Sequence, residues 1–273
     1  MFTNNFIQMK NTIIRILVYT LLFALIINGF KIFIQNPLFH DDYSNGYLIV
    51  MTILKVTLFL LTLFLLNYEK IKVSNYNKNK YLLIIVALII FFRLYQNVNS
   101  TSTELKMDID YSRLTYHGLL NLFIGLFEEF YFRVLVFTLL CSFYKKNLFK
   151  ITVLTSLLFG IVHISSLLLS SYNYSDVLFQ VMSAFAIGVI FQLLLINFKN
   201  IYIPVLIHFF IDFNSSFSEK FFNVTSNEIY DEGFDYTTFW TIFVLIILSL
   251  VFAYFNLRKK EVSYFQTGLI EKN

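Results

Sequence analysis

Six ionisable residues between positions 128 and 212 have the types and spacings that activate water. They are Glu128, Glu129, Arg133, His163, His208 and Asp212. A carboxylate in a low-dielectric cavity has a raised pKa and can act as a base near neutral pH. Glu128, helped by His163, could therefore deprotonate a water held between them. His208, oriented by Asp212, could donate a hydrogen bond to the oxyanion of a tetrahedral intermediate. This set of groups predicts hydrolysis of an amide bond.

The spacing of these residues predicts which of them meet. Glu129 and Arg133 are four apart, so on a helix they share one face and can form an ion pair. Glu128 lies about 100° further round the same turn, and we expect it to face a cavity. His208 and Asp212 are also four apart. A charged group at the centre of a bilayer costs at least ~2.5–3.5 kcal/mol, so such charges are usually paired and functional.

At each position taken alone, a purely structural role competes with a catalytic one. A membrane histidine is more often an interhelical hydrogen-bond partner, and a Glu–Arg pair usually just neutralises itself. Their joint occurrence favours a site. The chain lacks Gly-x-Ser-x-Gly, His-Glu-x-x-His and paired Gly-x-Gly-Asp motifs, which argues against serine, zincin and aspartyl mechanisms. Zinc held by Glu128, His163 and His208 is compatible with the ligand types. We rank metal-free catalysis first and expect no other cofactor.

The elements that must position these residues are membrane helices. The chain has 273 residues, of which 58% are hydrophobic and 14% are charged, and its mean hydropathy is +0.68. A soluble domain averages about 45–50% apolar and about 25% charged residues. Apolar runs long enough to cross a bilayer predict an all-α, polytopic bundle of about eight transmembrane helices. They cover residues 12–34, 47–67, 80–95, 116–142, 148–170, 177–197, 201–217 and 238–256.

The loops between these runs predict an orientation. Lysine and arginine gather in alternate loops and after the last run, whereas loops such as 96–115 and 218–237 are poorer in them. The positive-inside rule then places both termini in the cytoplasm of a multi-pass cell-membrane protein. The net charge of +4 lies in loops and predicts no nucleic-acid binding. Lys55 lies deep in its run, and we interpret it as a snorkelling side chain or a structural ion pair. The richness in Ile, Phe, Asn, Lys and Tyr suggests a bacterial source.

Three short motifs resemble those of a known family. Glu128-Glu129-x-x-x-Arg133, Phe159-x-x-x-His163 and His208-x-x-x-Asp212 occur in order on successive predicted helices. They are similar to the motifs of the CPBP intramembrane proteases, also called the Abi or type II CAAX prenyl protease family. The resemblance covers about residues 115–217. The third motif often ends in Asn in this family, whereas Asp212 stands here, and Asp cannot donate an amide hydrogen to an oxyanion.

The resemblance implies an eight-helix bundle and a peptidase that cleaves a membrane-associated peptide or protein. It implies that Glu128 activates water with His163, that His208 and Asp212 lie at the oxyanion side, and that Glu129 and Arg133 organise the site. Bacterial relatives are associated with peptide maturation and bacteriocin immunity.

We divide the chain into helices 1–115, a catalytic core 116–217 and a last part, 218–273, with an outer loop, a helix and a basic tail. The rival hypotheses are a non-catalytic interaction protein, with Ala184-x-x-x-Gly188 as its packing face, and a proton-coupled transporter.

Overall fold

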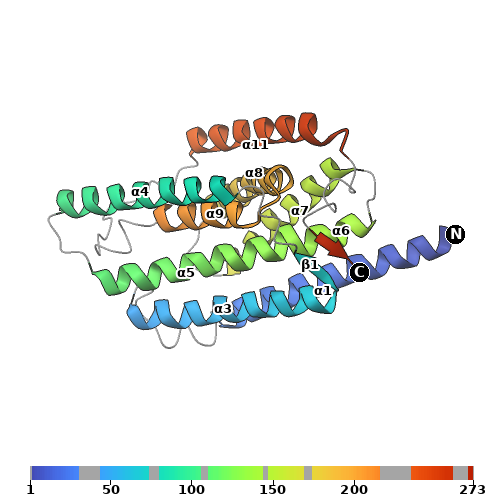
Figure 1. Ribbon diagram of the computed structural model, residues 1–273, viewed down its shortest axis with the longest axis horizontal. Coiled ribbons are helices and arrows are strands. Elements are labelled where there is room, and N and C mark those ends of the chain that lie inside the picture. The colour runs from blue at the N-terminus through green and yellow to red at the C-terminus, as the bar shows by residue number, and fades with distance from the viewer. Residues whose placement is uncertain are drawn as a thin grey trace.

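The computed structural model describes residues 2–30, 44–73, 80–105, 110–143, 147–168, 174–215, 235–260 and 270–272. Parts of the predicted spans, at 31–34, 169–170 and 216–217, lie outside these residues, as does most of the predicted loop 218–237. Within the described part, the chain forms eight helical segments, several of them side by side along the long axis of the molecule (Figure 1). The all-α bundle that the apolar runs predict is confirmed.

The helical segments follow the predicted order. They are α1 (Phe2–Phe30), α3 (Asn45–Tyr68), α4 (Lys80–Leu105), the continuous run of α5 (Tyr111–Glu129), η3 (Phe130–Val136) and α6 (Phe137–Phe143), α7 (Leu148–Val162) continued by η4 (His163–Leu168), α8 (Tyr174–Phe198), α9 (Tyr202–Ser215) and α11 (Tyr236–Leu257). Polar caps begin four of them: Ser44 before α3, Asp110 before α5, Asn147 before α7 and Asp235 before α11. Each cap side chain accepts a hydrogen bond from a backbone N–H of the first turn.

Two helices extend well beyond the predicted spans. The sequence predicted a span at 80–95, but α4 continues to Leu105 through a polar stretch. The first span was expected from residue 12, whereas α1 begins at Phe2. Falling hydropathy marks where a helix leaves the apolar layer and does not by itself end the helix. No Gly or Pro interrupts the extra turns of either helix, so the backbone hydrogen bonding simply continues.

The run α5–η3–α6 is the centre of the bundle. Every residue from 129 to 141 is buried, so this stretch contacts other helices on all sides. Helices α3 and α9 pack on α5, α7 and α8 reach η3, and α1 packs on α6. A π-helical segment, η3, begins directly after Glu129 and carries Arg133. Such wider turns are rare and often occur at functional sites.

Many of the outer helix faces are apolar. Leu17, Leu21 and Leu25 on α1, Leu88 and Phe91 on α4, and Leu248 and Phe255 on α11 are exposed. Exposed apolar surface of this extent is typical of lipid-facing helices. Within the part of the chain that the structure describes, four helices are both long and apolar enough to cross a membrane: Asn45–Tyr68, Leu148–Ser165, Tyr174–Phe198 and Tyr236–Leu257. The protein is therefore a membrane protein, and eight complete crossings stay a prediction.

A short sheet joins two distant parts of the chain. Strand β1 (Ile71–Val73) pairs antiparallel with β2 (Ile270–Lys272), with Ile71 opposite Lys272. Figure 1 shows β2 against β1 on the half of the molecule where α1 begins. The start of α1, strand β1 after α3, and strand β2 therefore lie toward one end of the bundle. This agrees with the predicted placement of both termini on one side, while the orientation in the cell stays a prediction.

The small-residue motif on α8 packs within the molecule. A Cβ added at Gly188 would lie 3.1 Å from Cβ of Ser156 and 3.3 Å from Cδ1 of the Phe159 ring, both on α7. Ala184 is also buried. The described structure thus uses Gly188 for close α7–α8 packing, which weakens its interpretation as a docking face for another protein.

Candidate active site

The end of α5 directs its two carboxylates to different surroundings. Glu129 and Arg133 are both fully buried, and Nε of Arg133 donates a hydrogen bond to Oε2 of Glu129 at 3.0 Å. The predicted ion pair is confirmed. The side chain of Glu128 is 17% exposed and lines a cavity, as the 100° step around the helix predicted.

Arg133 is enclosed on two sides. Its guanidinium carbon lies 4.6 Å from the centre of the Phe159 ring, a cation–π contact. Glu129 is its hydrogen-bond acceptor, while Nη1 and Nη2 have no hydrogen-bond partner among the described residues. A buried charge with so few partners is costly if its carboxylate is lost. Arg133 thus depends on Glu129, and Phe159 of the second motif supports Arg133 of the first.

His208 connects the first and third motifs. Its Nδ1 lies 2.9 Å from Oε1 of Glu129, and its Nε2 lies 3.3 Å from Oδ2 of Asp212. With a hydrogen on each nitrogen, the ring donates to both carboxylates at once. The sequence predicted the Asp212 contact, but it did not predict the contact with Glu129, 79 residues away. A continuous series of contacts runs from Arg133 through Glu129 and His208 to Asp212.

A glycine allows this connection to form. A Cβ added at Gly125 would lie 3.2 Å from the carbonyl oxygen of Val205 and 3.6 Å from Cβ of His208. Gly125 is one helical turn before Glu129, so α9 approaches α5 closely just where His208 must reach the buried carboxylate. A larger side chain at Gly125 would separate the two helices.

His163 stands at the junction of two kinds of helix. It caps α7 and begins η4, a 3₁₀ segment, whereas the sequence predicted one continuous helix over 148–170. Its Nδ1 lies 2.8 Å from the carbonyl oxygen of Phe159. Because a carbonyl oxygen can only accept, Nδ1 must carry the hydrogen of this bond. In the neutral ring, Nε2 then carries a lone pair that can accept a hydrogen bond.

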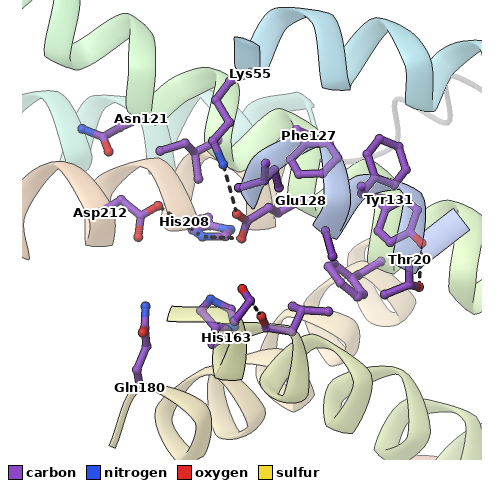
Figure 2. A pocket seen from close by; sticks show the side chains of 17 residues that line it. Thr20, Lys55, Asn121, Phe127, Glu128, Tyr131, His163, Gln180, His208 and Asp212 are labelled. Carbon is purple, nitrogen blue, oxygen red and sulfur yellow. Dashed lines mark hydrogen bonds and ion pairs between the residues drawn. The ribbon is translucent and has the colours of Figure 1, made fainter. Parts of the chain in front are cut away.

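One cavity of about 400 Å³ brings the predicted groups together. Among the polar residues that line it are Lys55, Asn121, Glu128, His163, Gln180, His208 and Asp212. Figure 2 shows Glu128, His208 and Asp212 along one wall, with His163 and Gln180 across the open space from them. Glu129 and Arg133 do not line the cavity, and Glu129 is connected to it through its contact with His208. The apolar side chains of Phe23, Ala24 and Ile27 on α1 cover part of the remaining wall.

Lys55 also lines the cavity, although the sequence analysis did not place it in the site. Its Nζ lies 3.9 Å from Oε1 of Glu128 and 5.5 Å from the centre of the Phe127 ring. In the structure Lys55 therefore does not snorkel to the interface. It forms the ion pair that was the alternative interpretation. A usable signal was its depth: Lys55 is the tenth residue after the start of α3, about 15 Å along the helix at ~1.5 Å per residue.

The predicted zinc ligands do not form a ready metal site. Oε2 of Glu128 and Nε2 of His208 are 3.8 Å apart, and His163 lies across the cavity. Among the described residues, no group of three His, Cys, Asp or Glu side chains is arranged to hold a metal ion. Zinc on Glu128, His163 and His208 would require these side chains to move.

The comparisons with known proteins agree with the motifs. Residues 112–214 match the family model described as type II CAAX prenyl endopeptidase Rce1-like. The match spans all three motifs and agrees with the predicted family resemblance, and the matched family is one of peptidases. No curated protein and no solved structure matches the chain.

Proposed function

We propose that this protein is a membrane peptidase of the CAAX-protease type and that it hydrolyses a membrane-associated peptide with water activated by Glu128 and His163. The observation that carries the proposal is that Glu128, His163 and His208, from three separate helices, line a single cavity. The apolar wall from α1 suits the aliphatic side chains of a substrate that enters from the bilayer.

The first step is the attack of water on the scissile carbonyl. A water between Glu128 and His163 donates one hydrogen to the Glu128 carboxylate and the other to the Nε2 lone pair of His163 as a hydrogen bond. Its oxygen forms a bond to the carbonyl carbon, the π electrons move to the carbonyl oxygen, and the first proton passes to Glu128. The product of this step is a tetrahedral oxyanion.

His208 is positioned to stabilise that oxyanion. Its Nδ1 is committed to Glu129 at 2.9 Å, whereas Nε2 is held less closely, 3.3 Å from Asp212 and 3.8 Å from Glu128. Nε2–H is therefore the donor that can turn to the substrate. Glu129 with Arg133 fixes the ring from behind. In this scheme Asp212 accepts the Nε2 hydrogen bond of His208 until the oxyanion forms and then gives it up to the oxyanion, which requires only an acceptor, so Asp serves in place of Asn.

The second step completes the hydrolysis. The oxyanion re-forms the carbonyl, the C–N bond breaks, and Glu128 returns its proton to the leaving nitrogen. One product gains the hydroxyl of the water as a new carboxyl group, and the other gains the proton as an amine. Glu128 ends as a carboxylate, ready for another turnover.

The test uses purified protein in lipid vesicles and a quenched fluorescent peptide with a prenylated CAAX terminus as the probe. Comparing membrane peptides from cells that express the wild type or Glu128→Gln identifies the natural substrate. We expect Glu128→Gln, His163→Ala and His208→Ala each to abolish cleavage in folded protein. Substitutions of residues that act as a unit have strongly non-additive effects on the rate. The cleavage rate of a double variant should therefore be little lower than that of a single variant.

Asp176→Asn is the matched control, since this exposed carboxylate at the start of α8 lies away from the cavity. It should cleave like the wild type. Full cleavage by Glu128→Gln would end the hydrolase mechanism and favour the proton-relay or interaction hypotheses. Comparison of the accumulated peptides also tests the roles in peptide maturation and bacteriocin immunity.

Chelation separates the metal-free mechanism from the zinc alternative. If Glu128 activates water directly, as we propose, the purified protein keeps its activity after treatment with a chelator and dialysis. Loss of activity that added zinc restores would instead assign a metal to Glu128, His163 and His208. The same vesicles and the same peptide serve for both measurements.

A further inference from the structure

Asn121 is a cavity-lining residue that the proposed mechanism does not use. It lies on α5 seven residues before Glu128, which is nearly two helical turns, so both residues face the same way. Only 4% of the residue is exposed. Figure 2 shows it on the side of the cavity that also carries Glu128 and Asp212. A buried polar group usually has a hydrogen-bond partner, so each atom of this amide needs one.

The orientation of the Asn121 amide is fixed by its own helix. Its Nδ2 donates a hydrogen bond to the backbone carbonyl oxygen of His117 at 3.0 Å and lies 3.0 Å from Nε2 of the same residue. Because a carbonyl oxygen can only accept, the amide atom beside it must be the nitrogen and not the oxygen. The ring of His117 is buried and packs on Phe213 of α9, with ring centres 5.2 Å apart. The amide nitrogen is therefore committed to His117, one turn earlier.

The amide oxygen of Asn121 remains available to a ligand. Among the described residues it has no hydrogen-bond partner, and it is not one of the polar atoms sealed inside the protein. In Figure 2 this oxygen is on the side of the amide that faces Asp212. An amide oxygen can only accept, so its ligand must be a donor. This excludes the oxyanion, which is itself an acceptor.

A peptide substrate brings a suitable donor in each backbone N–H. Such a group loses its water when the peptide enters the cavity, and leaving it unpaired costs free energy. The other acceptors at the cavity have tasks in the proposed mechanism: Glu128 and His163 bind the water, and Asp212 holds a histidine. Gln180 is exposed, so water competes for its amide. The buried amide oxygen on α5 is thus the acceptor best placed for the peptide backbone.

We propose that Asn121 is a substrate-binding residue whose amide oxygen accepts one backbone N–H of the peptide. The inference rests on the proposed function, because it takes a peptide as the occupant of the cavity. The seven residues from Asn121 to Glu128 span about 10 Å of helix at ~1.5 Å per residue. An extended peptide rises about 3.3 Å per residue. The bonded N–H therefore belongs to a residue about three positions from the scissile bond.

Backbone esters test this contact directly. In a series of prenylated peptides, each N–H in turn is replaced by an ester oxygen, which removes one hydrogen-bond donor. Binding of each peptide is measured on Glu128→Gln protein in lipid vesicles, so that cleavage does not interfere. The ester about three residues from the scissile position should bind roughly three- to tenfold more weakly than the parent peptide. When the protein also carries Asn121→Leu, the parent peptide should bind as weakly as this ester, and the ester should lose nothing more.

Cleavage kinetics give a second readout. The proposed bond is present both before and during the reaction, so Asn121→Leu alone should raise KM roughly three- to tenfold and leave kcat nearly unchanged. Asn256→Leu is the matched control. The Nδ2 of Asn256 also donates to the carbonyl oxygen four residues earlier, that of Phe252, at 3.0 Å, but on α11 and away from the cavity. This variant should match the wild type in both measurements.

The outcomes distinguish this inference from the proposed function. If each ester loses as much affinity with Asn121→Leu as without it, the amide accepts no N–H and the inference is wrong. A fall in kcat with an unchanged KM would also overturn it. If Asn121→Leu does not fold, equal binding of all the esters to protein that retains Asn121 would overturn the inference. If one ester shows the expected coupling but Glu128→Gln cleaves the peptide, the inference stands and the proposed mechanism fails.

Discussion

At the scale of single residues, the site depends on ion pairs in which one residue, such as Glu129, takes part in two pairs. Glu129 accepts from Arg133 through one oxygen and contacts His208 through the other. Its carboxylate therefore serves two partners that the sequence places on different helices. A residue in such a position supports the fold and the site at once, so its removal should affect protein abundance as well as activity.

Arg133→Ala tests this dual role. Removing one partner of a buried pair leaves an uncompensated charge and typically destabilises by about 3–5 kcal/mol. We expect lower abundance of Arg133→Ala in membranes and a lower thermal unfolding temperature. Glu128→Gln should retain wild-type abundance because Glu128 lies at the cavity surface. Equal abundance of the wild type and Arg133→Ala would contradict the structural part of this role.

A second variant separates the effect of the Glu129–Arg133 pair on protein stability from its effect on the position of His208. Arg133→Met combined with Glu129→Gln removes both buried charges, and such neutral replacements are often tolerated. The double variant should recover abundance relative to Arg133→Ala. It should stay inactive, since Gln cannot hold His208 as the carboxylate does. Recovery of both abundance and cleavage would show that Glu129 has no role in positioning His208.

At the scale of helices, close approach of α5 and α9 forms the site. Gly125 leaves room for the α9 backbone at Val205, and His208 follows three residues later. The π-helical segment that begins after Glu129 is fully buried. These features belong to packing between helices, and neither is evident from the polar motifs alone.

Gly125→Leu should displace α9 and separate His208 from Glu129. Overpacking of a buried contact typically destabilises by about 1–3 kcal/mol, so we expect reduced thermal stability and a large loss of cleavage. Gly29→Leu is the matched control, because nothing lies within 4 Å of a Cβ added at Gly29. Wild-type cleavage by Gly125→Leu would show that α9 need not approach α5 this closely.

At the scale of the whole molecule, the predicted orientation can be tested with reporters. The β1–β2 pairing places residues 71–73 beside 270–272, so reporters inserted at 74–79 and fused to the C-terminus should fall on the same side. The positive-inside rule predicts that this side is cytoplasmic. A reporter at 106–109, beyond the end of α4, should be external. Finding this reporter on the same side as the C-terminus would reject the eight-span topology.

The sequence by itself determined the features that depend on local spacing. Apolar runs predicted the eight helical segments, and the four-residue intervals predicted the Glu129–Arg133 and His208–Asp212 pairs, because one helical period brings such residues together. The family resemblance followed from the same motifs. Helix ends were less well predicted, as α4 shows, since hydropathy reports the surroundings of a helix and not its hydrogen bonding.

Only the tertiary structure decided which faces meet. The contact of His208 with Glu129 and that of Lys55 with Glu128 join residues on different helices, 79 and 73 positions apart (208 − 129 and 128 − 55). Their formation depends on how each helix is rotated and how closely it packs, which a glycine such as Gly125 controls. Periodicity within one helix carries no information about the rotation of its neighbour. For that reason the sequence left Lys55 as a snorkelling side chain or a structural ion pair, whereas in the folded protein it stands beside the candidate base.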